Sequence, residues 1–448
     1  MKNLISLFYT NLFLTRRLTA ALIGCSIIFV VSFFMEWLGI LPYLFFGTLM
    51  VLMLLDILLL YRTRNGVFAR RQAPDRLSNG DENELAVYIE NFYPFTIQAG
   101  IIDEIPHQFQ KRDVWFKTSV QPRRNKTLTY ILKPLKRGEY DFGLIRVFVH
   151  SPIGLLSRRY NFKEEEVLPV YPSFLQMRQY ELMAISNRLN ELGIKKIRRL
   201  GNSMEFEQIK TYVPGDDYRD INWKASARQG SLMTNSYTDE KSQQVYCIVD
   251  KSRAMKMPFE GLSLLDYAIN ASLVLSNVAL LKEDKAGLIT IGERTGAVIP
   301  AERKPAHINK ILEVLYKEKT RYLETNMEML YSTVRRVIKQ RSLVVFFTNY
   351  ESLSALQRHL PFLKRIASFH LLLVVFFENT ELKKVSQEPA TDVEGIYIKT
   401  IAEKFAYDKK LIVKELAKHG IQSILTTPQN LTVNAVNRYL ELKARQKI

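Results

Sequence analysis

Two runs, Leu343-Val-Val-Phe-Phe347 and Leu371-Leu-Leu-Val-Val-Phe-Phe377, set the architecture of the C-terminal half of this 448-residue chain. Every position in both runs is apolar, which is typical of strands that are buried on both faces of a parallel sheet. Strand and helix patterns alternate around them, so the sequence predicts a doubly wound α/β domain over residues 245–448. The predicted strands are Val245–Val249, Lys285–Ile291, Ser342–Thr348, Phe369–Phe377 and Gln422–Thr426. The predicted helices are Leu262–Leu281, Pro305–Tyr316, Asn326–Lys339, Leu353–Ile366, Ile401–His419 and Leu431–Arg445.

The residues just after the first of these strands are where a ligand is expected, because doubly wound folds bind ligands beyond the carboxyl ends of their strands. Asp250-Lys-Ser252-Arg-Ala254 is similar to the Asp-x-Ser-x-Ser signature of von Willebrand factor A domains, where carboxylate and hydroxyl oxygens hold Mg²⁺. The resemblance implies Thr325 as a further oxygen donor, but Ala254 replaces the second serine and Asn349 replaces a later carboxylate. We therefore predict a degenerate site at Asp250, Ser252 and Thr325, with no cofactor expected and Mg²⁺ as the alternative. A second interpretation is that these residues only complete a hydrogen-bonded strand end.

The most specific segment lies before that strand: Tyr212-Val-Pro-Gly-Asp-Asp-Tyr-Arg-Asp-Ile-Asn-Trp-Lys-Ala-Ser-Ala-Arg228. Its Pro-Gly pair predicts a turn, and the acids beside the turn are suited to capping a short helix. Every acid has a basic neighbour, so we expect ion pairs that hold a structural loop together. The candidate pairs join Asp216 or Asp217 to Arg219 or Arg228. The alternative is a metal-dependent hydrolase that uses the clustered acids Asp216, Asp217, Asp220 and Asp250.

Residues 72–172 alternate polar and apolar positions over short stretches, which is typical of half-buried strands. Examples are Glu84–Glu90, Leu128–Leu132 and Leu144–His150, and turn residues such as Ser78-Asn-Gly80 separate such stretches. Because no helical pattern intervenes, the sequence predicts an all-β, immunoglobulin-like sandwich. Residues 173–244 then form a linker and signature segment, with a helix predicted at Leu175–Leu189 and a basic stretch at Lys195–Arg199.

Residues 1–71 contain two apolar stretches, at about 18–35 and 37–61, and each can cross a hydrocarbon core of about 30 Å as a helix. The connection between them, which includes Glu36, is too short for anything except a helical hairpin. Basic residues flank both outer ends, so the positive-inside rule places the rest of the chain in the cytoplasm. These basic residues are Lys2, Arg16, Arg17, Arg62, Arg64, Arg70 and Arg71. We predict a multi-pass protein of the cell inner membrane with its soluble body in the cytoplasm.

Two residues of these stretches need separate interpretation. Asp56 is a lone charge in the second stretch, and we expect an interfacial carboxylate paired with an arginine rather than a functional ionisable group. Leu22-Ile-Gly-Cys25 matches a lipoprotein processing box. Because the apolar run continues after Cys25, a membrane span is favoured over lipidation.

Composition excludes several classes of protein. The formal net charge is +18, but basic and acidic residues are interleaved and no RNA-binding aromatic signature occurs, so no nucleic-acid partner is predicted. Attraction to anionic lipids gives a tethered cytoplasmic body a simpler reason to be basic. The two cysteines, Cys25 and Cys247, cannot form a disulfide framework or a zinc cluster. The sequence contains no phosphate-binding loop, no His-Glu-x-x-His and no Gly-x-Ser-x-Gly, so an enzyme is not predicted.

The string from Tyr212 to Arg228 resembles the core signature of the family called domain of unknown function fifty-eight. The similarity extends to the apolar stretches, to the β domain with its Arg137-Gly-Glu-Tyr140 and Ser151-Pro-Ile-Gly-Leu155, and to the α/β domain. The matching signature residues are Tyr212, Pro214, Gly215, Asp216, Asp217, Arg219, Asn222, Trp223 and Arg228. The resemblance implies no assigned reaction, a von Willebrand factor A-like domain and partnership with MoxR-type AAA+ ATPases. It predicts a membrane-tethered adaptor or scaffold that helps to assemble or activate a membrane protein complex.

Overall fold

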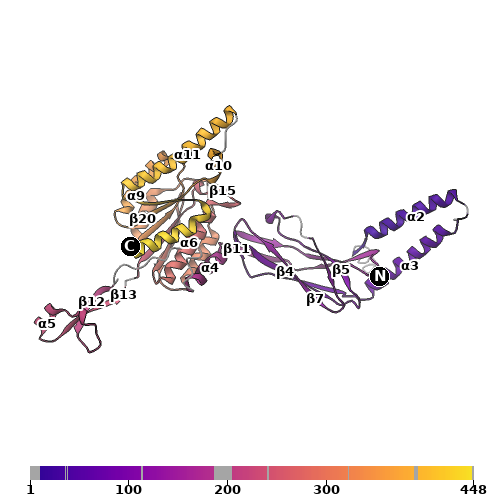
Figure 1. Cartoon of the computed structure of the whole chain (residues 1–448), viewed down its shortest axis with the longest axis horizontal. Coiled ribbons are helices and arrows are strands. Elements are labelled where there is room, and N and C mark those ends of the chain that lie inside the picture. Colours follow the sequence, from indigo (N-terminus) through magenta and orange to yellow (C-terminus); the bar gives the residue numbers. More distant parts are fainter. Residues whose placement is uncertain are drawn as a thin grey trace. The chain divides into compact units, whose positions relative to one another are not determined.

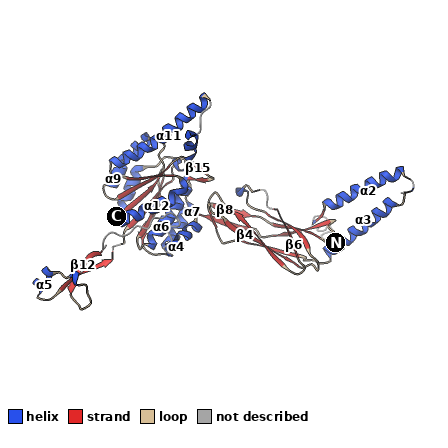
Figure 2. Ribbon diagram, viewed as in Figure 1, coloured by secondary structure: helices blue, strands red, loops and turns tan. Residues whose placement is uncertain are grey.

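A computed structural model describes residues 11–35, 37, 39–111, 115–185, 204–239, 242–320, 322–387 and 392–445. The chain divides into two compact units, Met1–Tyr171 and Pro172–Ile448. The first unit contains two long apolar helices and a β domain, and the second contains a β-hairpin and an α/β domain (Figures 1 and 2).

The β domain of the first unit has one five-stranded sheet, in the order β1-β10-β9-β5-β6, and two three-stranded sheets, β2-β4-β7 and β3-β11-β8. Buried and exposed side chains alternate along its strands, as in β4, where Leu85, Val87 and Ile89 are buried. This period of two confirms the predicted immunoglobulin-like β domain. The strands are β1 Leu12–Leu14, β2 Val67–Gln72, β3 Leu77–Ser78, β4 Asn83–Asn91, β5 Ile97–Asp103, β6 Trp115–Val120, β7 Asn125–Leu132, β8 Gly138–Phe142, β9 Ile145–His150, β10 Leu156–Phe162 and β11 Glu166–Tyr171.

Two strands of this β domain contain residues from before position 72. β1 lies ahead of the first apolar helix and pairs antiparallel with β10, so that Leu12 lies opposite Arg158. β2 begins at Val67, soon after the second apolar helix, and pairs antiparallel with β4. The β domain therefore holds the chain on both sides of the two apolar helices.

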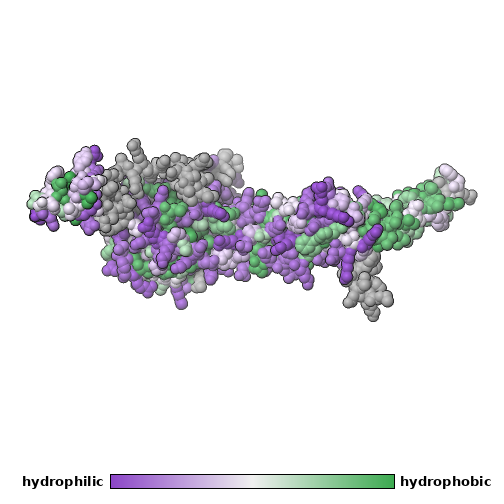
Figure 3. Space-filling model, turned by 90° about the horizontal axis from the view of Figure 1, so that it is seen from below, coloured by the Kyte–Doolittle hydropathy of each residue, from purple (hydrophilic) through white to green (hydrophobic). Residues whose placement is uncertain are grey.

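The apolar helices are α2, Arg16–Phe34, and α3, Leu41–Tyr61, and both are long and apolar enough to cross a membrane. They match the two predicted stretches, and many of their apolar side chains are exposed, as the green surface in Figure 3 shows. A third helix, α6, Leu264–Leu281, is also long and apolar enough to cross a membrane, but 83% of its residues are buried inside the structure. It is a core helix of the α/β domain. Lys2 and Glu36, which contributed to the topology prediction, lie outside the described residues.

Asp56 of α3 is fully buried and binds a loop of the β domain. Its Oδ2 accepts hydrogen bonds from the N–H groups of Leu155 at 2.9 Å and Leu156 at 2.8 Å, and its Oδ1 accepts one from the Ser151 hydroxyl. Gly154 shapes this loop with a φ of 73°, in the left-handed region that glycine adopts without strain. The predicted pairing with an arginine is therefore wrong, because loop amides and a hydroxyl surround this carboxylate.

Side chains of the β domain also cap the C-terminal end of α3. Nη1 of Arg158 donates hydrogen bonds to the carbonyl oxygens of Leu60 at 2.6 Å and Thr63 at 3.0 Å. The Tyr93 hydroxyl donates to the same Leu60 oxygen at 2.7 Å. A helix leaves its last carbonyl groups without partners in the helix, and Arg158 and Tyr93 satisfy that of Leu60, while Thr63 lies just beyond the helix. Asp56 and Arg158 together fix the second apolar helix to the β domain.

A buried ion pair joins Arg71 of β2 to Asp103 of β5 in the core of the β domain. Arg71 also donates to the carbonyl oxygens of Gly143 at 3.0 Å and Glu164 at 2.6 Å, and the Tyr130 hydroxyl donates to Asp103 at 2.5 Å. Burial and the neighbouring Asp103 carboxylate raise the pKa of Tyr130. Arg71, which the sequence suggested as a basic flank of the second span, is thus a core residue.

The α/β domain is built on a six-stranded sheet in the order β18-β17-β14-β19-β20-β21. Neighbouring strands run parallel, except that β18 is antiparallel to β17. Helices α8, α9 and α11 share a core with one face of the sheet, whereas α6 packs on β14 and contacts α12. The predicted α/β domain is confirmed. The strands are β14 Gln244–Asp250, β17 Lys285–Ile291, β18 Thr295–Glu302, β19 Leu343–Phe347, β20 Leu371–Phe377 and β21 Gln422–Thr426, and the other helices are α7 His307–Lys317, α8 Met327–Val337, α9 Leu353–Ala367, α10 Thr380–Gln387, α11 Val393–Lys418 and α12 Leu431–Ala444.

Several elements of the second unit differ from the prediction. β18 and α10 were not predicted, and α11 begins at Val393 rather than Ile401. In the linker, where the sequence predicted a helix at Leu175–Leu189, the structure has α4 at Phe174–Ile185. This helix contacts α6. Residues 186–203, including the basic stretch Lys195–Arg199, lie outside the described residues. The signature segment begins and ends in strands that were also not predicted.

Replacing Asp56 with alanine should lower the free energy of unfolding of the first unit by about 3 kcal/mol, because three buried donors lose their acceptor. Thermal unfolding of the full-length protein in lipid nanodiscs measures the change. Asp75→Ala, at an exposed position, is the control and should have no effect. An unchanged melting temperature for Asp56→Ala would show that the loop does not need this carboxylate.

Arg71→Met should destabilise the β domain by about 3 to 5 kcal/mol, because Asp103 would stay buried without its counter-charge. The neighbouring exposed residue gives a matched control, Arg70→Met, which should be nearly neutral. Adding Asp103→Leu to Arg71→Met should recover part of the loss in the same unfolding assay. Equal instability of the single and double variants would contradict a role for the unpaired charge.

Candidate functional site

Asp250 ends β14 and is buried among hydrogen-bond donors. Its Oδ1 accepts bonds from the Ser252 N–H group at 2.9 Å and from the Thr325 hydroxyl, and its Oδ2 accepts one from the Thr348 hydroxyl at 2.7 Å. The structure therefore brings together the three residues predicted for the degenerate site and adds Thr348. Both carboxylate oxygens already have partners in the domain.

Asn349 occupies the position of the missing carboxylate and forms a different contact. Its Nδ2 donates to the Ala254 carbonyl oxygen at 3.3 Å, and its Oδ1 accepts a hydrogen bond from Lys409 Nζ at 2.7 Å. Lys409 comes from α11 and is only 9% exposed. Burial lowers the pKa of its ammonium group to about 8. A cationic side chain thus approaches the edge of the sheet where a metal-binding domain would need negative charge.

The chemistry of this donor set is poor for a divalent cation. Mg²⁺ prefers several oxygen ligands with negative charge, whereas Asp250 supplies one carboxylate and Ser252 and Thr325 supply neutral oxygens. In the part of the chain that the structure describes, no group of three or more histidine, cysteine, aspartate or glutamate residues could hold a metal ion. If a metal bound here, Asp250, Ser252 and Thr325 would be the residues to hold it.

The signature segment folds as a β-hairpin with a short helical insertion, here called the signature hairpin, residues 204–239. Strands β12, Met204–Thr211, and β13, Met233–Asp239, pair antiparallel. Between them, α5, Trp223–Gln229, begins at Asn222, whose side chain accepts a hydrogen bond from the Ala225 N–H group at 3.0 Å. The Asn222 Nδ2 atom donates to Asn235 Oδ1 at 2.9 Å and so ties α5 to β13. Asn222 is therefore a structural residue of the signature.

Two acids of the signature hairpin, Asp216 and Asp217, are used in its own structure. Asp216 pairs with Lys210 at 2.9 Å and accepts a hydrogen bond from the Val213 N–H group at 3.2 Å, and these bonds lower its pKa. The predicted pairing with Arg219 or Arg228 is wrong, because Lys210 of β12, six residues before Asp216, pairs with this carboxylate instead. Asp217 caps the helical turn that follows, by accepting from the Arg219 N–H group, as predicted for an acid beside the Pro-Gly turn.

The described contacts do not join the hairpin acids to Asp250 in one site. All hydrogen-bond partners given above for Asp250 belong to the α/β domain, and those of Asp216 and Asp217 belong to the hairpin. The four acids proposed for a hydrolase therefore fall into two separate sets of contacts.

The signature hairpin instead exposes large apolar side chains. Trp223 is 70% exposed and Tyr218 is 68% exposed, and Val213 is also exposed. Trp223 follows the capping residue Asn222 directly, so it occupies the first position of α5. Sequence reasoning left the burial of this tryptophan open. The cap beside it was the available signal that it lies at a helix start rather than in a core.

Comparison with known proteins places these residues in a family. Residues 208–389 match the family described as protein of unknown function DUF58. Uncharacterized protein YeaD of Bacillus subtilis (strain 168) is 27% identical over 294 residues, which are 63% of this chain and 68% of YeaD.

Two solved structures also resemble the chain. Conserved hypothetical protein BatB from Bacteroides thetaiotaomicron is 14% identical with a TM-score of 0.31, over 46% of this chain and 100% of that one. An aerotolerance-related membrane protein from Bacteroides fragilis NCTC 9343, with multiple mutations to serines, is 14% identical with a TM-score of 0.27 over the same shares. At these TM-scores we draw no functional conclusion from the two structures.

The family match begins within β12 and runs through the signature hairpin, the Asp250 site and most of the α/β sheet. It covers the motif from Tyr212 to Arg228 on which the family resemblance rests. The chain therefore contains a region, residues 208–389, that matches the DUF58 family of proteins of unknown function.

Proposed function

We propose that this protein is a membrane-tethered adaptor or scaffold, with α2 and α3 in the inner membrane and with the β domain and the second unit in the cytoplasm. The observation that carries the proposal is the exposure of Trp223 and Tyr218 on a signature hairpin in which Asp217 and Asn222 bond to other residues of the hairpin. Tryptophan and tyrosine are enriched among the residues that dominate binding energy at protein interfaces. A surface of this kind fits binding better than catalysis.

The proposed partner is a MoxR-type AAA+ ATPase, as the family resemblance implies, and the proposed process is assembly or activation of a membrane protein complex. A von Willebrand factor A-like role for the α/β domain is supported by its mostly parallel sheet with Asp250 and Ser252 after the first strand. The basic flanks of the apolar helices support the cytoplasmic orientation. The net charge of +18 suits a body beside anionic lipids.

A metal-dependent hydrolase is the alternative, and the contacts do not favour it. A general base must have a carboxylate oxygen free to reach a proton of the substrate or water. Asp216 is bound to Lys210 and to backbone, Asp217 caps a helical turn, and Asp250 accepts from three donors. We therefore expect no turnover by the protein alone.

Affinity capture of the full-length protein from its native membrane should recover an AAA+ ATPase. The double variant Tyr218→Ser, Trp223→Ser should reduce the recovery to about a tenth or less, because losing an aromatic anchor costs about 2 kcal/mol or more. Tyr322→Ser, at a residue 72% exposed elsewhere, is the matched control and should leave recovery unchanged. Equal recovery with the double variant would move the binding surface away from the signature hairpin.

Calorimetric titration with Mg²⁺, Mn²⁺ or Ca²⁺ up to millimolar concentration should give no saturable heat. One carboxylate that already accepts three hydrogen bonds offers a divalent cation too little negative charge. The Asp250→Ala variant sets the background of the measurement. A saturable heat that this variant abolishes would support a metal site and make the hydrolase alternative the one to pursue.

A further inference from the structure

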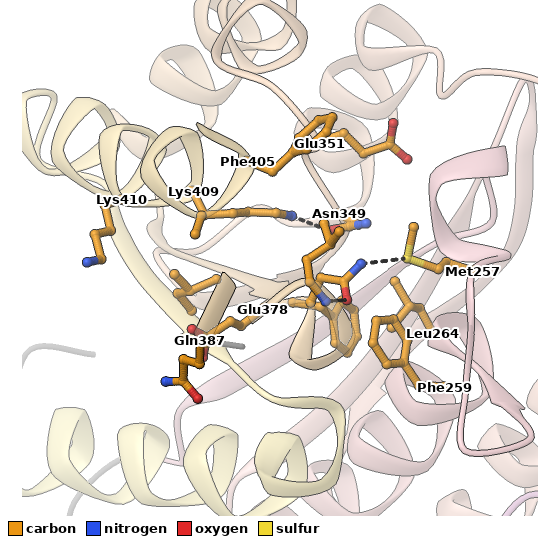
Figure 4. A pocket seen from close by; sticks show the side chains of 15 residues that line it. Met257, Phe259, Leu264, Asn349, Glu351, Glu378, Gln387, Phe405, Lys409 and Lys410 are labelled. Atoms are coloured by element: carbon orange, nitrogen blue, oxygen red, sulfur yellow. Dashed lines mark hydrogen bonds between the residues drawn. The ribbon is translucent and has the colours of Figure 1, made fainter. Parts of the chain in front are cut away.

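A cavity of about 520 Å³ opens at the carboxyl ends of β19, β20 and β21, beside α11 (Figure 4). Its walls are mainly apolar side chains from elements far apart in the sequence. They include Met257, Phe259, Leu264, Phe377, Leu382 and Phe405. Cavities of roughly 300 to 1,000 Å³ with apolar walls and few polar groups are typical of small-molecule sites.

Lys409 is the polar group that distinguishes this cavity. It is one of four charged residues in the lining, with Glu351, Glu378 and Lys410, and the other three are less buried. Figure 4 shows the Lys409 side chain reaching toward Asn349, and the Glu351 carboxylate directed away from the Lys409 ammonium group. The buried charge of the cavity is therefore positive.

The Lys409 ammonium group has unused capacity to donate. It carries three N–H groups, and Asn349 Oδ1 accepts from one of them at 2.7 Å. No ion pair joins Lys409 to a carboxylate among residues 11–445 where the structure describes them. A buried ammonium group with a single neutral acceptor is costly, and an anion beside it would offset that cost.

Apolar surface next to this charge is also left open. Met257 and Phe405 line the cavity and are both among the exposed large apolar residues of the domain. A ligand that covered them would remove apolar area from water, which favours binding. The apolar walls therefore favour a ligand with an apolar body. The buried Lys409 ammonium group favours a ligand that also carries a negative charge.

We propose that this cavity binds a small carboxylate with an apolar body, with the carboxylate on Lys409 Nζ and the body against Met257, Phe259 and Phe405. Charge complementarity with Lys409 selects the acid, and the wall residues select its apolar part. This ligand site adjoins the Asp250 site through Asn349, which lines the cavity, but Asp250 itself does not line it. It also stands independently of the adaptor proposal, which rests on the signature hairpin.

The test is calorimetric titration of the full-length protein in detergent with 4-phenylbutanoate and with its uncharged amide, 4-phenylbutanamide. The wild-type protein should bind the acid at least about tenfold more tightly than the amide, because only the acid forms a charge-assisted hydrogen bond. Lys409→Met keeps an apolar side chain of similar length and should lose this preference. Lys414→Met, on the same helix, exposed and outside the cavity lining, is the matched control and should keep it.

The comparison of acid with amide on the wild-type protein needs no variant, so the proposal remains testable if Lys409→Met fails to fold. Equal affinity for the two probes, or no binding of either at millimolar concentration, would overturn the proposal. Retention of the preference in Lys409→Met would also overturn it, because the selecting charge would then lie elsewhere.

Discussion

The carboxylate of Asp56 is the contact on which the organisation of the first unit depends. A charge in an apolar helix is costly unless it is paired, and three donors from the Ser151–Leu156 loop meet that need. The same loop holds the start of the other apolar helix, because the Thr15 hydroxyl lies 2.8 Å from the carbonyl oxygens of Gly154 and Leu155. One loop therefore joins both apolar helices to the β domain, and the helices and sheets form one body.

Much of the fold could be predicted from the sequence, because apolar periodicity reports burial directly. β17 and β21 begin and end at the predicted residues, and both apolar helices lie where hydropathy placed them. The missed elements lack that signal. β18 is an edge strand with mostly part-exposed positions, and α10 is a short polar helix. In β12, a register shift between Phe206 and Gln208 breaks the alternation that would have marked a strand.

The candidate sites could be predicted only where a motif gave their residues in advance. The Asp-x-Ser pattern led to Asp250 and, through the family resemblance, to Thr325, although 75 positions separate the two. No local pattern links Lys409 to Asn349, which are 60 positions apart, or Asp56 to Leu156, which are 100 positions apart. Such contacts arise from tertiary packing, so a reading of neighbouring residues could not have found them. The same limit explains why Asp216 was assigned arginine partners when its partner is Lys210.

The pairing of β1 with β10 has a consequence for biosynthesis. Leu12 leaves the ribosome before both apolar helices, and its partner Arg158 leaves after them. The five-stranded sheet can therefore be completed only after both apolar helices have been synthesised, and only if the chain before α2 and the chain after α3 lie on the same side. A chain whose β1 could not reach β10 would leave β10 as an open sheet edge, which favours aggregation. Closure of the β domain therefore depends on where both ends of the helical hairpin lie.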